Sequence, residues 1–188
     1  MAKKPLPSPE VLRQLLRYEP ETGKLFWRER GAEFFNDSGK ITAETRSLQW
    51  NSRYAGTEAF KIKKENEYLR GQVFKVDMYA HRVIWALTYN EWPDGDIDHI
   101  NGNRTDNRIN NLRDVSRSEN LKNQKRGSRN TSGAIGVSWC RMRGLWRARL
   151  FVDGREIEVG VFADFDAAVA ARQLANKQYG FHKNHGRG

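Results

Sequence analysis

Apolar residues recur at helical spacing in two stretches of the first half of the chain. The first stretch follows Ser8-Pro9-Glu10, where a hydroxyl cap, a proline and an acid mark the start of a helix, and its apolar stripe ends at Leu15 and Leu16. The second covers residues 79–90 and stops at Trp92-Pro93-Asp94-Gly95. We therefore predict one helix at each of these places.

Between these two helices the pattern changes to short runs that are typical of strands. Residues 25–27 predict one strand, and residues 59–79 predict two strand-like runs on either side of Glu65-Asn66-Glu67. Residues 30–52 are polar and only weakly periodic, so we predict a long loop there.

The second half of the chain begins after a polar, basic stretch at residues 124–133, which contains no apolar residue and indicates a linker. Beyond it, residues 137–139, 145–152 and 155–161 predict three short strands, with Asp153-Gly154 as the hairpin turn between the last two. An alanine-rich helix is expected over residues 165–179.

The composition is strongly basic, with 33 Lys and Arg against 23 Asp and Glu and a net charge of +10. An excess of this size indicates a polyanionic partner, most commonly nucleic acid. The single cysteine, Cys140, excludes an internal disulfide and any multi-cysteine zinc site. No segment predicts a membrane span or a signal peptide, so we expect a cytoplasmic protein.

Residues that carry chemistry gather at 96–123. Ile97-Asp98-His99-Ile100-Asn101-Gly102-Asn103 is followed by Asp106-Asn107-Arg108, by Asn110-Asn111-Leu112-Arg113 and by a capping-box pattern at residues 116–120. Carboxylate and amide oxygens are ligands for Mg²⁺, and a neutral imidazole can take a proton from water near pH 7. One acid, one imidazole and one late Asn would therefore suffice to cleave a phosphodiester, provided that the imidazole faces a solvent-filled cleft.

A calcium-binding loop is a rival interpretation, because Asp96, Asp98 and Gly102 resemble an EF-hand. It fails because Ile100 stands at a ligand position and the flanking helices are missing. His81, in the helix before the motif, is expected to be structural, by packing or capping, and a phosphate contact is the alternative role.

The combined pattern resembles the HNH endonuclease motif, the ββα-metal nuclease site of phage and intron-encoded proteins. If the chain is phage-encoded, we expect it in the cytoplasm of a bacterial host cell. The resemblance implies one divalent ion, Mg²⁺ with Mn²⁺ as a substitute. It implies that His99 is the general base, that Asn111 braces the loop and orients His99, and that Asp98 and Asn120 bind the metal. Asn120 stands where many members have His, and Asn123 stays open as an alternative ligand.

Residues 132–184 resemble an AP2 domain, a three-stranded sheet packed on one helix that occurs in plant transcription factors and phage endonucleases. The matching segments are Gly136-Val137, Trp146-Arg147-Ala148-Arg149-Leu150, Val159-Gly160-Val161-Phe162, Ala167-Ala168, Ala170-Ala171-Arg172 and Tyr179-Gly180. Strand alternation directs Arg147 and Arg149 outward, toward guanines or phosphates in a major groove. The expected DNA-binding residues are Arg141, Arg143, Arg147, Arg149 and, in the linker, Lys125, Arg126 and Arg129.

Glu156 and Glu158 depart from the usual AP2 pattern. They either pair across the strands with Arg147 and Arg149 or accept hydrogen bonds from cytosine amino groups. A solvated sheet face covered with ion pairs would explain the same residues without DNA.

These features predict an α+β fold: a β-rich extension at 1–78, an HNH module at 79–124, a linker at 125–133, an AP2-like domain at 134–184 and a tail at 185–188. The predicted function is metal-dependent hydrolysis of double-stranded DNA, by nicking or double-strand cleavage, in a homing endonuclease-like monomer or weak dimer. A non-catalytic DNA-binding or regulatory protein that retains an HNH fold is the alternative. A nuclease that acts on RNA is a third option.

Overall fold

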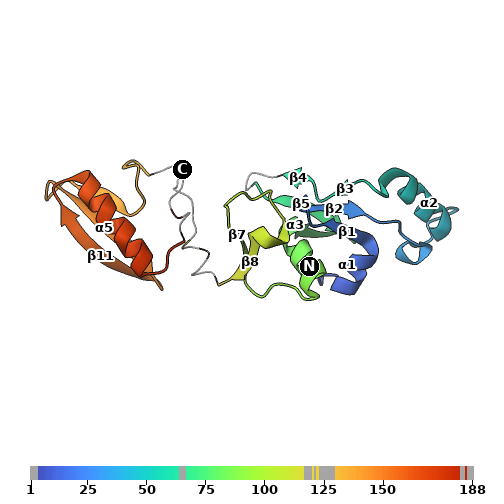
Figure 1. Ribbon diagram of the computed structural model, residues 1–188. Helices are drawn as coiled ribbons and strands as arrows, with labels where there is room; N and C mark the ends of the chain where they lie inside the picture. The colour runs from blue at the N-terminus through green and yellow to red at the C-terminus, as the bar shows by residue number, and fades with distance from the viewer. Residues whose placement is uncertain are drawn as a thin grey trace. The chain divides into compact units, whose positions relative to one another are not determined.

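The computed structural model describes residues 4–63, 67–116, 120, 122, 130–182 and 185. The chain divides into two units, Met1–Asp114 and Val115–Gly188, and each has its own hydrophobic core (Figure 1). The described part combines helices with several small sheets, so the predicted mixed α and β class is confirmed. None of its helices is long and apolar enough to cross a membrane.

The first unit begins with α1 (Pro9–Leu15), where Ser8 caps the helix as its sequence predicts. One three-stranded sheet contains β1 (Leu16–Glu19), β2 (Lys24–Trp27) and β3 (Glu58–Ala59). A second contains β4 (Ile62–Lys63), β5 (Leu69–Val73) and β6 (Val76–Tyr79). The predicted second helix is α3 (Ala80–Tyr89), and β7 (Asp96–His99), the 3-10 turn η2 (Ile109–Asn111) and β8 (Leu112–Val115) follow it.

The prediction of a long loop at residues 30–52 was wrong. A 3-10 turn, η1 (Ala32–Phe34), and a helix, α2 (Ala43–Tyr54), occupy much of this stretch. The helix packs through few side chains: Trp50 meets the Trp27 ring edge-on at 5.6 Å, and Asn51 Nδ2 donates to the Arg30 carbonyl at 3.1 Å. A helix held by one aromatic ring and a few hydrogen bonds shows little hydrophobic periodicity, and this is why the pattern did not reveal it.

The second strand-like run of residues 59–79 is itself a hairpin, formed by β5 and β6. Its turn residues, Phe74 and Lys75, have left-handed φ angles of 52° and 63°. Such angles usually call for Gly or Asn, so the turn has no signature in the sequence.

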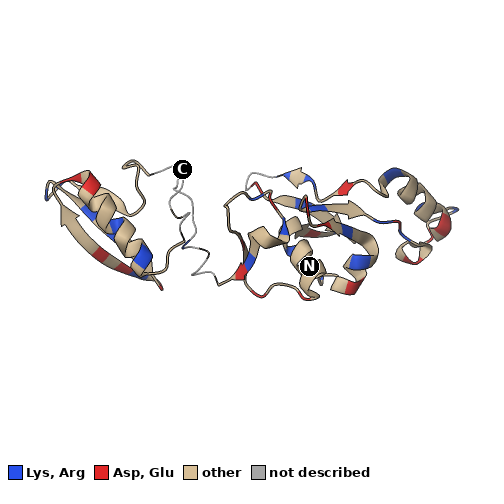
Figure 2. Ribbon diagram, viewed as in Figure 1, with Lys and Arg blue, Asp and Glu red and all other residues tan. Residues whose placement is uncertain are grey.

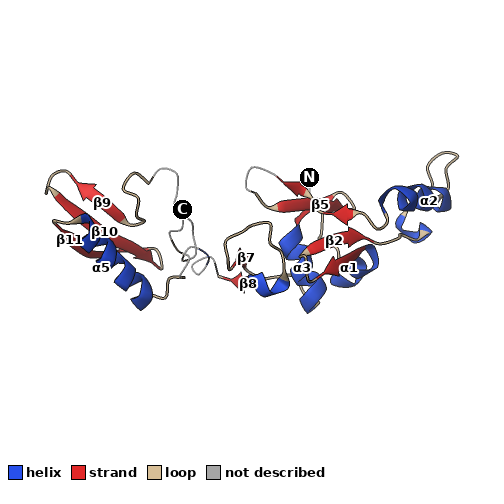
Figure 3. Ribbon diagram, turned by 45° about the horizontal axis from the view of Figure 1, so that its top comes forward, coloured by secondary structure: helices blue, strands red, loops and turns tan. Residues whose placement is uncertain are grey.

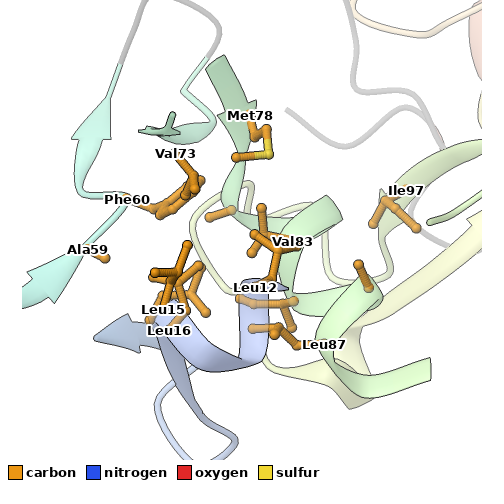
Figure 4. Close-up of a cluster of buried hydrophobic side chains, with 14 of the residues drawn as sticks. Leu12, Leu15, Leu16, Ala59, Phe60, Val73, Met78, Val83, Leu87 and Ile97 are labelled. Atoms are coloured by element: carbon orange, nitrogen blue, oxygen red, sulfur yellow. The ribbon is translucent and has the colours of Figure 1, made fainter. Parts of the chain in front are cut away.

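The core of the first unit lies between α1, α3 and the two three-stranded sheets. Figure 4 shows Leu12 of α1 beside Val83 and Leu87 of α3, with Phe60 and Val73 in the same cluster. Leu12 and Val83 are completely buried. The core therefore fixes α3, which leads directly to the HNH-like segment.

Residues of the N-terminal extension contact the HNH-like segment directly. The Tyr18 hydroxyl accepts a hydrogen bond from Ile109 N at 2.9 Å and donates one to Asn107 O at 3.3 Å. At Gly23, with φ of 73°, an added Cβ would lie only 2.6 Å from Arg108 N. The extension therefore supports the loop that carries the candidate site.

The second unit contains the three strands and the helix that the sequence predicted. β9 (Val137–Cys140), β10 (Leu145–Val152) and β11 (Arg155–Phe162) form an antiparallel sheet in the order β11-β10-β9. Figure 3 shows α5 (Phe165–Gln178) lying against this sheet, and Ala148 and Ala168 are buried between them. The predicted turn at Asp153-Gly154 has φ angles of 49° and 78°.

The capping-box pattern predicts a helix that starts at Arg117 and carries Asn120 and Asn123, but residues 117–119, 121 and 123 lie outside the described part. Of its residues, Asn120 is described, and its backbone N donates to Ser116 O at 3.0 Å, as in one helical turn. Beyond this one turn, the helix of the expected ββα module therefore stays a prediction.

We predict that Gly23→Ala destabilises the first unit much more than Gly39→Ala. Both glycines have left-handed φ angles, 73° and 62°, so an alanine costs each about 1–2 kcal/mol in backbone strain. At Gly39 nothing lies within 4 Å of the added Cβ, whereas at Gly23 the backbone of residues 107 and 108 must move. Urea unfolding of both variants measures the difference. Equal losses would contradict the close packing of the extension on the loop.

Candidate active site

His99 lies at the end of β7, with its imidazole inside the first unit. The residue is 3% exposed. Its ring contacts those of Tyr68 and His81, at centroid distances of 5.7 Å and 5.3 Å. The sequence-based mechanism requires this imidazole to face a solvent-filled cleft, but the structure covers it with other side chains.

One hydrogen bond determines which ring nitrogen of His99 carries the hydrogen. Nε2 of His99 is 2.9 Å from Oδ1 of Asn107, a residue that is completely buried. An amide oxygen only accepts, so with this orientation of the Asn107 amide Nε2 carries the hydrogen and Nδ1 of the neutral ring carries the lone pair. Burial lowers the pKa of His99 below its ordinary value, and the hydrogen bond to Asn107 opposes this. The ring is therefore neutral near pH 7, as a general base must be.

Asn111 holds the loop that follows His99. Its Oδ1 accepts from Asn101 N at 2.9 Å, and its Nδ2 donates to Asp106 O at 2.8 Å. Its backbone oxygen accepts from Ile100 N at 2.9 Å. These bonds join both ends of the loop, which is the geometry that a bracing role for Asn111 requires.

Asp98 is 8% exposed and forms a salt bridge with Arg113 of β8. Arg113 Nε and Nη2 both donate to the same carboxylate oxygen, Oδ2, at 2.9 Å and 2.7 Å. The arginine therefore competes with a cation for this oxygen.

The donor chemistry of Asp98 and Asn120 suits Mg²⁺, which binds few protein oxygens and keeps several waters. Among the described residues no group of three or more His, Cys, Asp or Glu is arranged to hold a metal. A metal site would therefore rest on one carboxylate, one amide and oxygens from phosphate and water. Asn120 belongs to the second unit, so the structure does not place it against Asp98. Asn123 lies outside the described residues.

Aromatic rings and one arginine surround His99 in a way that the sequence did not reveal. His81 stacks on Tyr79 with centroids 5.3 Å apart, and Tyr68 lies 5.0 Å from His81. The guanidinium of Arg104 lies over the Tyr68 ring at 5.0 Å. His81 is 6% exposed and packs among these rings, in line with the structural role expected for it. Tyr68 and Arg104 belong to no sequence pattern, so only the fold identifies them.

Two of the arginines expected to bind DNA, Arg147 and Arg149, lie on the outer face of the second unit's sheet. Arg147 pairs with Glu156 at 2.6 Å and with Glu158 at 2.7 Å. Arg149 pairs with Glu156 at 2.9 Å. Of the two roles considered for these glutamates, the structure shows cross-strand pairing.

The other expected DNA-binding residues lie elsewhere in the second unit. Arg141 and Arg143 are exposed in the turn between β9 and β10. Lys125, Arg126 and Arg129 lie outside the described residues.

Comparisons with known proteins support a nuclease. Residues 78–122 match the family model described as HNH endonuclease. The chain is 36% identical over 77 residues to Protein 3.8 of Escherichia phage T7, in an alignment that covers 40% of this chain and 64% of that protein. The chain thus spans less than two thirds of the length of that relative. No solved structure matches the chain.

We predict that His81 makes the folded state sensitive to acid. Burial lowers the pKa of His81 from 6.5 to about 3, so between these values the unfolded chain binds a proton that the folded chain does not. The free energy of unfolding should therefore fall by about 2 kcal/mol more in the natural chain than in His81→Phe when the pH drops from 7 to 5. Urea unfolding at both pH values measures this. Parallel losses would show that His81 is not buried as a neutral ring.

Proposed function

We propose that this chain is a metal-dependent DNA endonuclease, in which the first unit cleaves the backbone and the second unit holds the duplex. The observation that carries this proposal is the hydrogen bond between His99 and Asn107, within the segment that matches the HNH endonuclease family. It gives a neutral imidazole with its lone pair on Nδ1, one residue after Asp98 in β7.

In the proposed reaction Nδ1 of His99 accepts a proton from a water molecule whose oxygen attacks phosphorus. The bond between phosphorus and the 3′ oxygen breaks, and the departing oxygen takes a proton from solvent. Asn111 contributes by holding the loop, so that the His99 ring keeps its orientation. A bound divalent cation would supply positive charge that stabilises the phosphate and the departing oxygen. Asp98 and Asn120 are the residues proposed to hold it, with Mg²⁺ preferred and Mn²⁺ as a substitute.

The burial of His99 sets a condition on this mechanism: the covering side chains must move when DNA enters. Arg104 lies over the Tyr68 ring, which in turn contacts the His99 ring. A phosphate attracts an arginine more strongly than a tyrosine ring does at a partly exposed site. An incoming phosphate would therefore attract Arg104, and Tyr68 must also move before a phosphate reaches His99.

The second unit has the charge expected of a part that binds duplex DNA. Residues 115–188 contain 14 Lys and Arg against 6 Asp and Glu, so this unit holds +8 of the net charge of +10. Its three strands and one helix have the arrangement that the AP2 resemblance implied. A basic unit of this kind binds phosphates through counterion release, largely independently of sequence.

A non-catalytic DNA-binding protein is the second candidate function. Two observations favour it: His99 is 3% exposed, and Arg113 already holds the carboxylate of Asp98. In this case the HNH fold would act as a structural platform, and the basic second unit would carry the whole function.

Nicking of a supercoiled plasmid in the presence of Mg²⁺ or Mn²⁺ tests the proposal. We expect the natural chain to nick the plasmid, EDTA to abolish nicking, and His99→Ala to slow it by about 10²- to 10⁴-fold, the usual contribution of a general base. His182→Ala is the matched control, since it removes a histidine from the second unit, and it should nick at the natural rate. Duplex binding, measured without metal, should be unchanged in both variants.

Two results would contradict this account in different ways. If His99→Ala nicks as fast as the natural chain, His99 is not the base. If the natural chain binds duplex DNA but never nicks it with either metal, the non-catalytic function replaces the enzyme.

A further inference from the structure

We propose that the second unit contacts duplex DNA through the turn between β9 and β10, and not through the outer face of its sheet. In this arrangement Arg141 and Arg143 bind phosphates on either side of a groove, and Met142 between them reaches the bases. The inference rests on the proposed function, because it assumes that this unit binds DNA. It departs from the expectation that Arg147 and Arg149 make the contact.

The outer face of the sheet is electrically neutral in the structure. Arg147, Arg149, Glu156 and Glu158 form one network of salt bridges with two charges of each sign. Figure 2 shows acidic positions along β11, the strand that pairs with β10. A phosphate that approached this face would have to displace carboxylates that already hold both guanidinium groups. The network therefore offers little net attraction for DNA.

The turn between β9 and β10, in contrast, carries positive charge that no salt bridge to a described residue neutralises. Arg141 and Arg143 are exposed, and neither forms a salt bridge with any residue that the structure describes. Arg143 N and Gly144 N both donate to Cys140 O, at 3.2 Å and 2.9 Å. These bonds hold the backbone of the turn in shape, so little backbone freedom is lost when the arginines bind phosphates.

Met142 lies at the tip of this turn and is 95% exposed. An unbranched apolar side chain flanked by arginines is suited to contact base edges in the major groove, such as the methyl group of thymine. Trp139 is 47% exposed at the base of the turn and lines a hollow of about 540 Å³ together with Arg141. The turn thus presents positive charge and apolar surface on one narrow projection, and a two-stranded ribbon of this kind fits a DNA groove.

Binding of the full chain to a fluorescent duplex, measured by anisotropy in EDTA at several salt concentrations, tests the proposal. For Arg141→Gln/Arg143→Gln we expect an affinity at least about tenfold lower. The slope of log affinity against log salt concentration should be smaller by about two, because two phosphate contacts are removed. For Met142→Ser we expect lower affinity with an unchanged salt dependence, since no charge is removed.

Two matched controls address the outer face. Arg147→Gln/Arg149→Gln/Glu156→Gln/Glu158→Gln removes the whole network without changing the net charge, and its affinity should equal that of the natural chain. Phe151→Ser removes an apolar side chain that is 59% exposed on the same face, and it should also bind normally. This second control holds even if the fourfold variant fails to fold, which circular dichroism would reveal.

The inference is overturned if the outer-face controls lose as much affinity as the turn variants, or if the turn variants bind like the natural chain. A natural chain that fails to bind duplex DNA at all would instead overturn the proposed function of this unit.

Discussion

The hydrogen bond between His99 Nε2 and Asn107 Oδ1 is the contact on which the candidate chemistry depends. It leaves the lone pair of the neutral ring on Nδ1, while burial lowers the pKa of His99 and so keeps the ring neutral against the opposing effect of this bond. Asn107 is itself held from the other side, because its backbone oxygen accepts from the Tyr18 hydroxyl. The N-terminal sheet is therefore linked to the histidine through a single buried asparagine.

This arrangement has a thermodynamic cost. Asn107 is completely buried, and its Nδ2 has no hydrogen-bond partner among the described residues. A buried donor without an acceptor costs about 1–3 kcal/mol. An apolar residue at this position would avoid that cost but could not fix the tautomer of His99. A costly polar group retained in a core is a common property of sites that serve chemistry.

Elements with strong local signals could be predicted from the sequence, and those held by tertiary contacts could not. α1, α3 and the strands of the second unit follow from caps, periodicity and the Asp153-Gly154 turn. α2 was missed because a single tryptophan and a few hydrogen bonds hold it in place. The β5–β6 turn was missed because Phe74 and Lys75 give no turn signal.

The same division applies to the candidate site. Asp98, His99 and Asn111 are close together in sequence, so the motif could identify them, and Asn111 has the contacts of a loop brace. Tyr68 and Arg104 reach His99 only through the fold. Residue alternation along a short strand cannot tell whether its last side chain meets solvent or other rings, so the burial of His99 could not be foreseen.

The protonation state of His99 is the most direct test of this account. Long-range proton–nitrogen NMR correlations on the imidazole report which ring nitrogen carries the hydrogen, with the His99 signal assigned by its loss in His99→Ala. At pH 7 the account predicts a neutral ring with the hydrogen on Nε2, and a mixture of tautomers in Asn107→Ala, where the acceptor is removed. A charged ring, or a hydrogen on Nδ1 in the natural chain, would contradict it.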